Sequence, residues 1–146
     1  MSFAIRDHAH ASAPSLRFRG NSRLNNGEFD VAILGAGPAG LSAAARAAQR
    51  KLTHVVLEAT ARHANTIQQY QHRKHVMAEP GLMPLRSDMQ FAAGRREDVL
   101  GKWADAIQRT NLHIRYDSEV TAISGAHGAF DVALKCGTNG LPSRNV

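Results

Sequence analysis

Six consecutive residues, Gly35-Ala36-Gly37-Pro38-Ala39-Gly40, match the pattern G-x-G-x-x-G and could bind phosphate. In this pattern the first glycine permits a tight turn and the second lets the backbone approach a pyrophosphate. The third lets the following helix pack closely on a sheet. Pro38 suits the first turn of a helix, whose N-terminus offers free amides and a positive dipole end to phosphates. We therefore predict that residues 35–40 hold the pyrophosphate of a dinucleotide.

One acid completes this pattern. Glu58 follows Gly40 by 18 residues, close to the roughly 20 expected of an acid that binds a ribose hydroxyl. An acid here disfavours a 2′-phosphate, so NADP is not expected at this turn. Three glycines can also mark an ordinary turn that binds nothing. The agreement of strand, turn, helix, second strand and terminal acid favours a binding site over that alternative.

The elements that must position these residues form one strand–helix–strand unit. Residues 29–34 are a short apolar run that stops at glycine, as a buried parallel strand does. Residues 41–51 are rich in alanine and read as a helix, and residues 53–58 read as a second buried strand. The crossover between the strands should be right-handed. We expect small residues to help the helix pack on the sheet, namely Ala43, Ala44 and Ala47.

The rest of the sequence predicts a further helix, one more strand for this sheet, and two strands that form a second sheet. Residues 59–94 lack a clear period, contain Pro80, Gly81 and Pro84, and read as irregular structure with one helical turn. Residues 95–110 have apolar side chains at helical spacing, among them Trp103, which we expect in the core. Residues 112–116 alternate as a strand, which we place at an unprotected sheet edge. Two more strands follow around a turn at residues 125–128.

These patterns predict an α/β fold with a parallel sheet, helices and an added antiparallel β-meander. With 146 residues the chain has room for one domain, which we place at residues 28–136. Residues 1–27, rich in Ser, His and Arg, are expected to be a disordered leader, and residues 137–146 a flexible tail.

Charge and cysteine content limit the other classes of function. The formal net charge of +6 is spread along the chain, which disfavours nucleic acid as a partner. A lone cysteine, Cys136, cannot form an internal disulfide or a CxxC pair and is expected to be an inert thiol. With no apolar run of about 20 residues, neither a membrane span nor a membrane partner is predicted. A cytoplasmic location is the default for such a chain.

Other chemical candidates are weaker. His72 and His75 have metal-ligand spacing but no evident third ligand, so no metal site is predicted. We expect Arg62, Arg73 and Lys74 to form a solvated basic face. No Ser-His-Asp arrangement can be defended, and no catalytic residue is assigned.

The segment FDVAILGAGPAGLSAA, followed by VVLE, resembles the N-terminal FAD-binding turn of two-dinucleotide-domain flavoproteins. Within that superfamily, NTIQQYQ, HVMAEP and REDVLGKW resemble thioredoxin-reductase-like pyridine nucleotide-disulfide oxidoreductases. The resemblance implies a Rossmann-like FAD/NAD(P)-binding three-layer domain with FAD at the glycine turn. It also implies a backbone contact from Val120, in the Glu119-Val120 step, to the adenine, and it places residues 65–84 near the flavin ring.

The sequence departs from such relatives after residue 135. They continue with a strand ending in an ATG-like turn, a second glycine-rich domain for NAD(P)H and a late GD motif, and none of these occurs here. We therefore expect a fold incomplete at the C-terminus, with NAD(P)H bound by missing domains or by a partner chain. Turnover by this chain alone, the electron acceptor, the nicotinamide preference and the oligomeric state are not predicted.

Three hypotheses follow. The chain is the FAD-binding portion of an NAD(P)H-dependent flavoprotein oxidoreductase, a stand-alone NAD- or ADP-ribose-binding module, or a non-catalytic truncated remnant.

Overall fold

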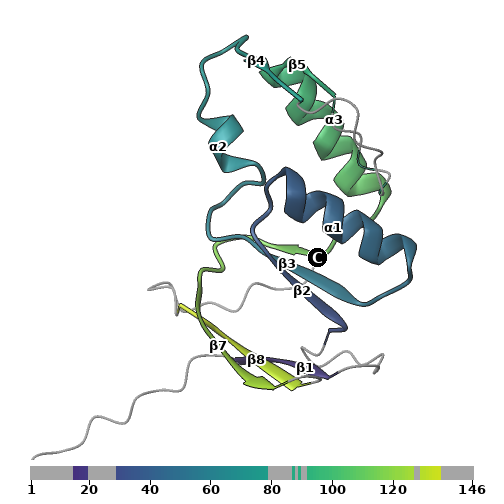
Figure 1. The fold of residues 1–146 in the computed structure, drawn as a ribbon. Helices are drawn as coiled ribbons and strands as arrows, with labels where there is room; N and C mark the ends of the chain where they lie inside the picture. Colours follow the sequence, from purple (N-terminus) through teal and green to yellow (C-terminus); the bar gives the residue numbers. More distant parts are fainter. Residues whose placement is uncertain are drawn as a thin grey trace, which may run out of the picture.

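The computed structural model describes residues 15–19, 29–78, 87, 89, 92–126 and 129–135. These residues form three layers (Figure 1). Two helices, α1 and α3, cover one face of a parallel sheet, and an antiparallel sheet covers the other. The predicted α/β class and layer arrangement are confirmed.

The parallel sheet has the strand order β2-β3-β6, with bounds Val31–Leu34, His54–Leu57 and Ile114–Arg115. Helix α1, Pro38–Gln49, connects β2 to β3, so the predicted strand–helix–strand unit is present. Every residue of the central strand β3 is buried, as both neighbours and both layers cover it. Strand β6 lies at one edge of this sheet, where residues 112–116 were expected, and β2 lies at the other.

The main core fills the space between the sheet and the helices. Helix α3, Arg96–Arg109, contributes Trp103, which is 3% exposed, and α1 contributes Leu41, which is fully buried. The alanines of α1 allow close helix–sheet packing. One expectation about them was wrong: Ala43 lies on the exposed side of α1, and Ala45 takes the buried place beside Ala44 and Ala47.

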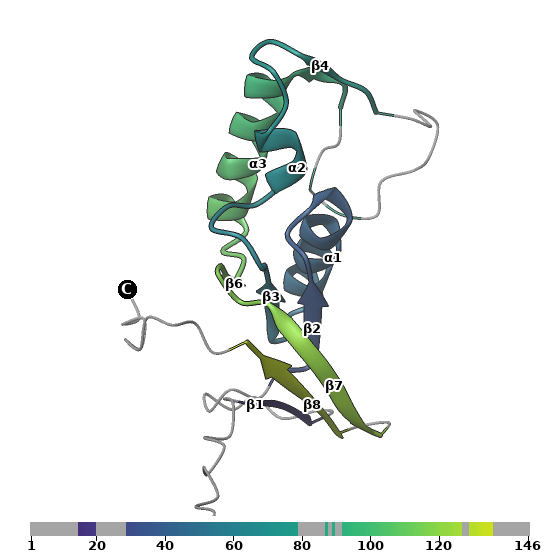
Figure 2. The same cartoon turned by 90° about the vertical axis from the view of Figure 1, so that its left-hand side faces the viewer.

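The second core lies on the opposite face of the parallel sheet. There Val55 and Leu57 of β3 pack against Val132 and Leu134. The latter two belong to β8, Ala129–Leu134, which pairs antiparallel with β7, Val120–Ala126, as the predicted meander requires. Figure 2 shows this antiparallel sheet lying below β2 and β3.

A third strand of the antiparallel sheet comes from the segment that the sequence assigns to a leader. Strand β1, Ser15–Arg19, pairs antiparallel with β8 over its whole length. Its sequence, SLRFR, alternates apolar and polar residues, the period of a strand, but is too short to predict one by itself. The remainder of residues 1–27 lies outside the described residues, as do Cys136 and the predicted tail.

Three short elements occupy the predicted irregular stretch. Helix α2, Asn65–Gln68, is the expected single turn. Strands β4, His75–Val76, and β5, Gly94–Arg95, pair antiparallel beside the start of α3 (Figure 1). The predictions for Pro80, Gly81 and Pro84 lie outside the described residues.

Candidate dinucleotide site

The glycine turn follows β2, and its first residue has a backbone conformation that favours glycine. Gly35 has φ of 93°, a left-handed value that favours glycine, and its N–H donates to Leu57 O at 2.8 Å. This hydrogen bond extends the β2–β3 ladder by one residue and fixes where the turn begins.

The other two glycines are required for different reasons. A Cβ added to Gly40 would collide with the carbonyl oxygen of Gly35, so the fold itself requires glycine there. At Gly37 no described heavy atom beyond Gly37 and its two chain neighbours lies within 4 Å of an added Cβ, and φ is −78°. Packing within this part of the chain therefore does not explain Gly37. Open space beside its backbone is what the close approach of a pyrophosphate needs.

Helix α1 begins at this turn, where the first amide groups of a helix have no partner within the helix. Gly37 is its N-cap residue and Pro38 its first residue. No described side chain caps this end, and the first turn carries no acid. The first intrahelical bond is Leu41 N–H to Gly37 O, 2.9 Å, so the amides of Ala39 and Gly40 have no acceptor within the helix. An anionic group such as a phosphate could therefore bind at this helix start.

Glu58, at the carboxyl end of β3, is joined to the glycine turn. Its Oε2 accepts from Ala36 N–H at 2.7 Å, and its Oε1 accepts from Thr60 N–H and Thr60 Oγ1 at 2.9 and 2.7 Å. Burial raises the pKa of Glu58, but the hydrogen bonds from Ala36 and Thr60 outweigh burial and hold that pKa below its usual value. The carboxylate is therefore ionised at neutral pH.

These contacts limit what else Glu58 can bind. An ionised carboxylate has about four acceptor positions, and three donors already occupy this one. About one position remains for a ribose hydroxyl. Glu58 thus has a structural role that the motif spacing did not predict, because its carboxylate fixes the position of Ala36 N–H in the turn.

The backbone N–H and C=O groups of Val120 point away from the neighbouring strand β8. It pairs with Leu134 in the β7–β8 ladder, and the adjacent bond runs from Lys135 N–H to Glu119 O, 2.8 Å. Since successive residues of a strand direct their N–H and C=O groups to opposite sides, those of Val120 point away from β8. This orientation leaves them available to a ligand, as the predicted contact requires.

A second group of contacts lies near the glycine turn and Glu58, and no pattern in the sequence predicts it. Ala64 N–H donates to Ala36 O at 2.8 Å, and Ala64 has left-handed φ and ψ of 51° and 39°. His63 Nδ1 lies 3.3 Å from Tyr116 Oη. Burial lowers the pKa of His63, and burial with the nearby charge of Glu58 raises the pKa of Tyr116. Both side chains are therefore neutral at pH 7.

No metal site was predicted, because His72 and His75 have no evident third ligand. In the structure His72 Nε2 lies 3.5 Å from Glu97 Oε1, and His75 pairs through its backbone with Arg95. No group of three or more metal-binding side chains occurs among the described residues.

Arg73 and Lys74 are exposed, as expected of a solvated basic face. No helix among the described residues is long and apolar enough to span a membrane.

The fold and the turn define a Rossmann-like dinucleotide-binding protein. Residues 32–143 match the family model described as pyridine nucleotide-disulphide oxidoreductase, so the chain belongs to that family. The predicted kinship is confirmed.

Solved structures support the same placement. Thioredoxin reductase from T. acidophilum has 27% identity and a TM-score of 0.53, over 73% of this chain and 30% of that one. A flavin-containing monooxygenase from Stenotrophomonas maltophilia has 26% identity and a TM-score of 0.57, over 73% and 34%. Bacillithiol disulfide reductase from Staphylococcus aureus, at 19% identity and a TM-score of 0.56 over 70% and 32%, shares the fold. The chain thus spans about a third of each structure, and no curated protein sequence matches it significantly.

Proposed function

We propose that the chain is the FAD-binding portion of an NAD(P)H-dependent flavoprotein oxidoreductase. The observation that carries the proposal is the open space at Gly37, next to an uncapped helix start and an ionised carboxylate. Membership of the pyridine nucleotide-disulphide oxidoreductase family and likeness to flavin-dependent relatives support a flavin in that space. When bound, the flavin would accept hydride from a nicotinamide and pass the electrons to an acceptor.

The residues of this chain would bind and orient the cofactor. The Gly37 backbone and the first-turn amides of α1 would receive the pyrophosphate. Glu58 would accept one ribose hydroxyl with its remaining acceptor position and repel a 2′-phosphate. The N–H and C=O of Val120, which point away from β8, would contact the adenine edge. NAD(P)H would be bound by further domains or by a partner chain.

A second candidate is a module that binds NAD or ADP-ribose without redox turnover. One observation favours this candidate. The groups described above would contact the pyrophosphate, one ribose and the adenine, and FAD, NAD and ADP-ribose all contain these parts. The part of the chain that the structure describes contains no assigned contact to a flavin ring.

Absorption spectroscopy separates these candidates. The purified chain is mixed with FAD and passed through gel filtration, and its visible spectrum is recorded. We expect retained bands of oxidised flavin. Calorimetric titrations with FAD, NAD and ADP-ribose then rank the ligands. FAD binding no tighter than ADP-ribose would favour the second candidate, and failure of all three to bind would refute both.

A further inference from the structure

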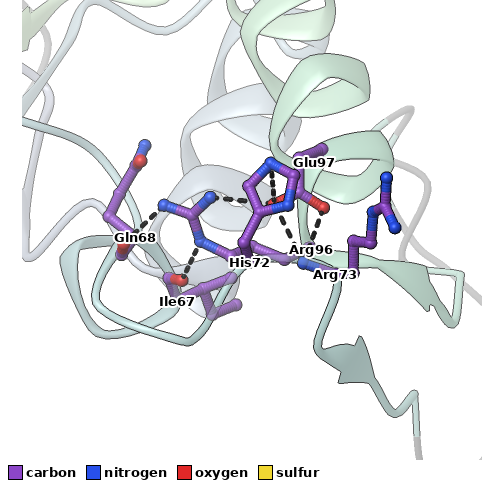
Figure 3. A network of polar contacts seen from close by, with 6 residues as sticks. All are labelled: Ile67, Gln68, His72, Arg73, Arg96 and Glu97. Atoms are coloured by element: carbon purple, nitrogen blue, oxygen red, sulfur yellow. Dashed lines mark hydrogen bonds and ion pairs between the residues drawn. The ribbon is translucent and has the colours of Figure 1, made fainter.

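Two adjacent residues at the start of α3 hold the segment around α2 (Figure 3). The Arg96 guanidinium donates from Nε to Ile67 O at 3.2 Å and from Nη2 to Gln68 O at 2.6 Å. Ile67 O also accepts from Tyr70 N–H at 3.1 Å, so Arg96 adds a second donor there and binds the next carbonyl of the helix end as well. Because the donor is charged and its side chain is only 20% exposed, these bonds are stronger than ordinary ones.

Glu97 holds the following turn at the same place. Its carboxylate accepts from Arg73 N–H, 3.3 Å to each oxygen, and from Arg96 Nη1 at 3.1 Å. Arg73 has φ of 63°, an uncommon value for a non-glycine residue, and Arg96 N–H donates to Lys74 O at 2.9 Å. We call Arg96 and Glu97 the α3 clamp. Figure 3 shows both residues between the chain at Ile67 and Gln68 and the chain at His72 and Arg73.

The opposite end of α2 is joined to the glycine turn. Ala64, the N-cap residue of α2, donates to Ala36 O while in a left-handed conformation that is unfavourable for alanine. A helix of one turn has no stability of its own and depends on contacts at its ends. Helix α2 therefore connects the glycine turn to the α3 clamp through four residues.

We propose that Arg96 is a positioning residue for the dinucleotide turn. By holding the carboxyl end of α2, it keeps Ala64 in place and so orients the Ala36–Gly37 peptide towards the pyrophosphate. Arg96 acts through α2 and does not touch the ligand. The inference rests on the proposed dinucleotide function.

The test compares two variants that remove the same charge from the same end of α3. Arg96→Met removes the guanidinium but keeps an unbranched stem. Arg95→Met changes the preceding residue, which is exposed. Binding to the full chain is measured for ADP, which carries a pyrophosphate, and for adenosine, which does not. We expect Arg96→Met to weaken ADP binding roughly 2- to 30-fold, the range for coupling through packed elements, and to leave adenosine binding unchanged. Arg95→Met should leave both unchanged.

A second readout does not depend on ligand binding. In the ligand-free chain, Arg96→Met should shift the backbone amide resonance of Gly37, and Arg95→Met should not. If the wild-type chain bound no ADP, the proposed function would fail, and the Gly37 resonance would still test the clamp.

Three results would overturn the inference: unchanged ADP binding in Arg96→Met, an equal loss for ADP and adenosine, or an unshifted Gly37 resonance. Should Arg96→Met not fold, Arg96→Lys replaces it. Lysine keeps the charge but cannot bridge both carbonyls in the planar fork geometry, so an intermediate loss of ADP affinity is expected. Wild-type ADP affinity in Arg96→Lys would also overturn the inference.

Discussion

Replacing Gly37 with valine tests the phosphate role of the turn separately from the fold. No described heavy atom beyond the two chain neighbours lies within 4 Å of a Cβ added at Gly37. With φ of −78° and ψ of −177°, the backbone lies in the extended region, which a β-branched residue adopts readily. We therefore expect the free energy of unfolding to change by no more than about 1 kcal/mol, the scale of an altered N-cap residue.

The loss of binding should be much larger. Valine at this position blocks the approach of the pyrophosphate to the turn, where two or more backbone amides would donate to it. Hydrogen bonds to charged groups contribute about 1.5–3 kcal/mol each, so two lost bonds cost roughly 3–6 kcal/mol. This corresponds to a weakening of about 10²- to 10⁴-fold.

The assay is calorimetric titration with FAD and with ADP-ribose, alongside urea denaturation of each variant. Gly101→Val is the matched control, because Gly101 on α3 also has nothing described within 4 Å of an added Cβ. The control should bind normally. Normal binding by Gly37→Val would refute the assignment of the turn to the pyrophosphate. A loss of stability equal to the loss of binding would show that Gly37 serves the fold instead.

Three further predictions concern the same site. Gly40→Ala should lower stability by about 1–3 kcal/mol in urea denaturation, since the methyl group meets the Gly35 carbonyl, and an unchanged midpoint would contradict this close packing. Glu58→Ala should weaken dinucleotide binding by roughly 1–3 kcal/mol in titrations, and unaltered affinity would remove Glu58 from the site. Because the pKa of Glu58 is lowered in the folded chain, its contribution to stability is complete above the ordinary carboxyl pKa of about 4.3 and is lost as the pH falls through the lower folded value. Denaturation between pH 3 and 6 should therefore show a flatter profile for Glu58→Ala, whereas parallel profiles would rule out this linkage.

The elements with local patterns could be predicted from the sequence alone. The apolar runs before and after the glycine turn predicted β2 and β3, because buried strands need consecutive apolar residues. Helical spacing predicted α3, and the residues of the turn predicted a phosphate-binding geometry. These features depend on neighbours within a few positions, so a sequence pattern records them directly.

The contacts between distant segments could not be predicted from the sequence and are seen first in the folded structure. It joined Glu58 to Ala36 and Ala64 to Ala36, and it placed Arg96 against α2. It also paired β1 with β8 across more than 100 residues of chain. Each of these contacts depends on how the layers fold onto one another, and no spacing in the sequence encodes that arrangement. The same reason explains why motif spacing suggested Glu58 as a ribose ligand but did not predict that its carboxylate fixes the turn.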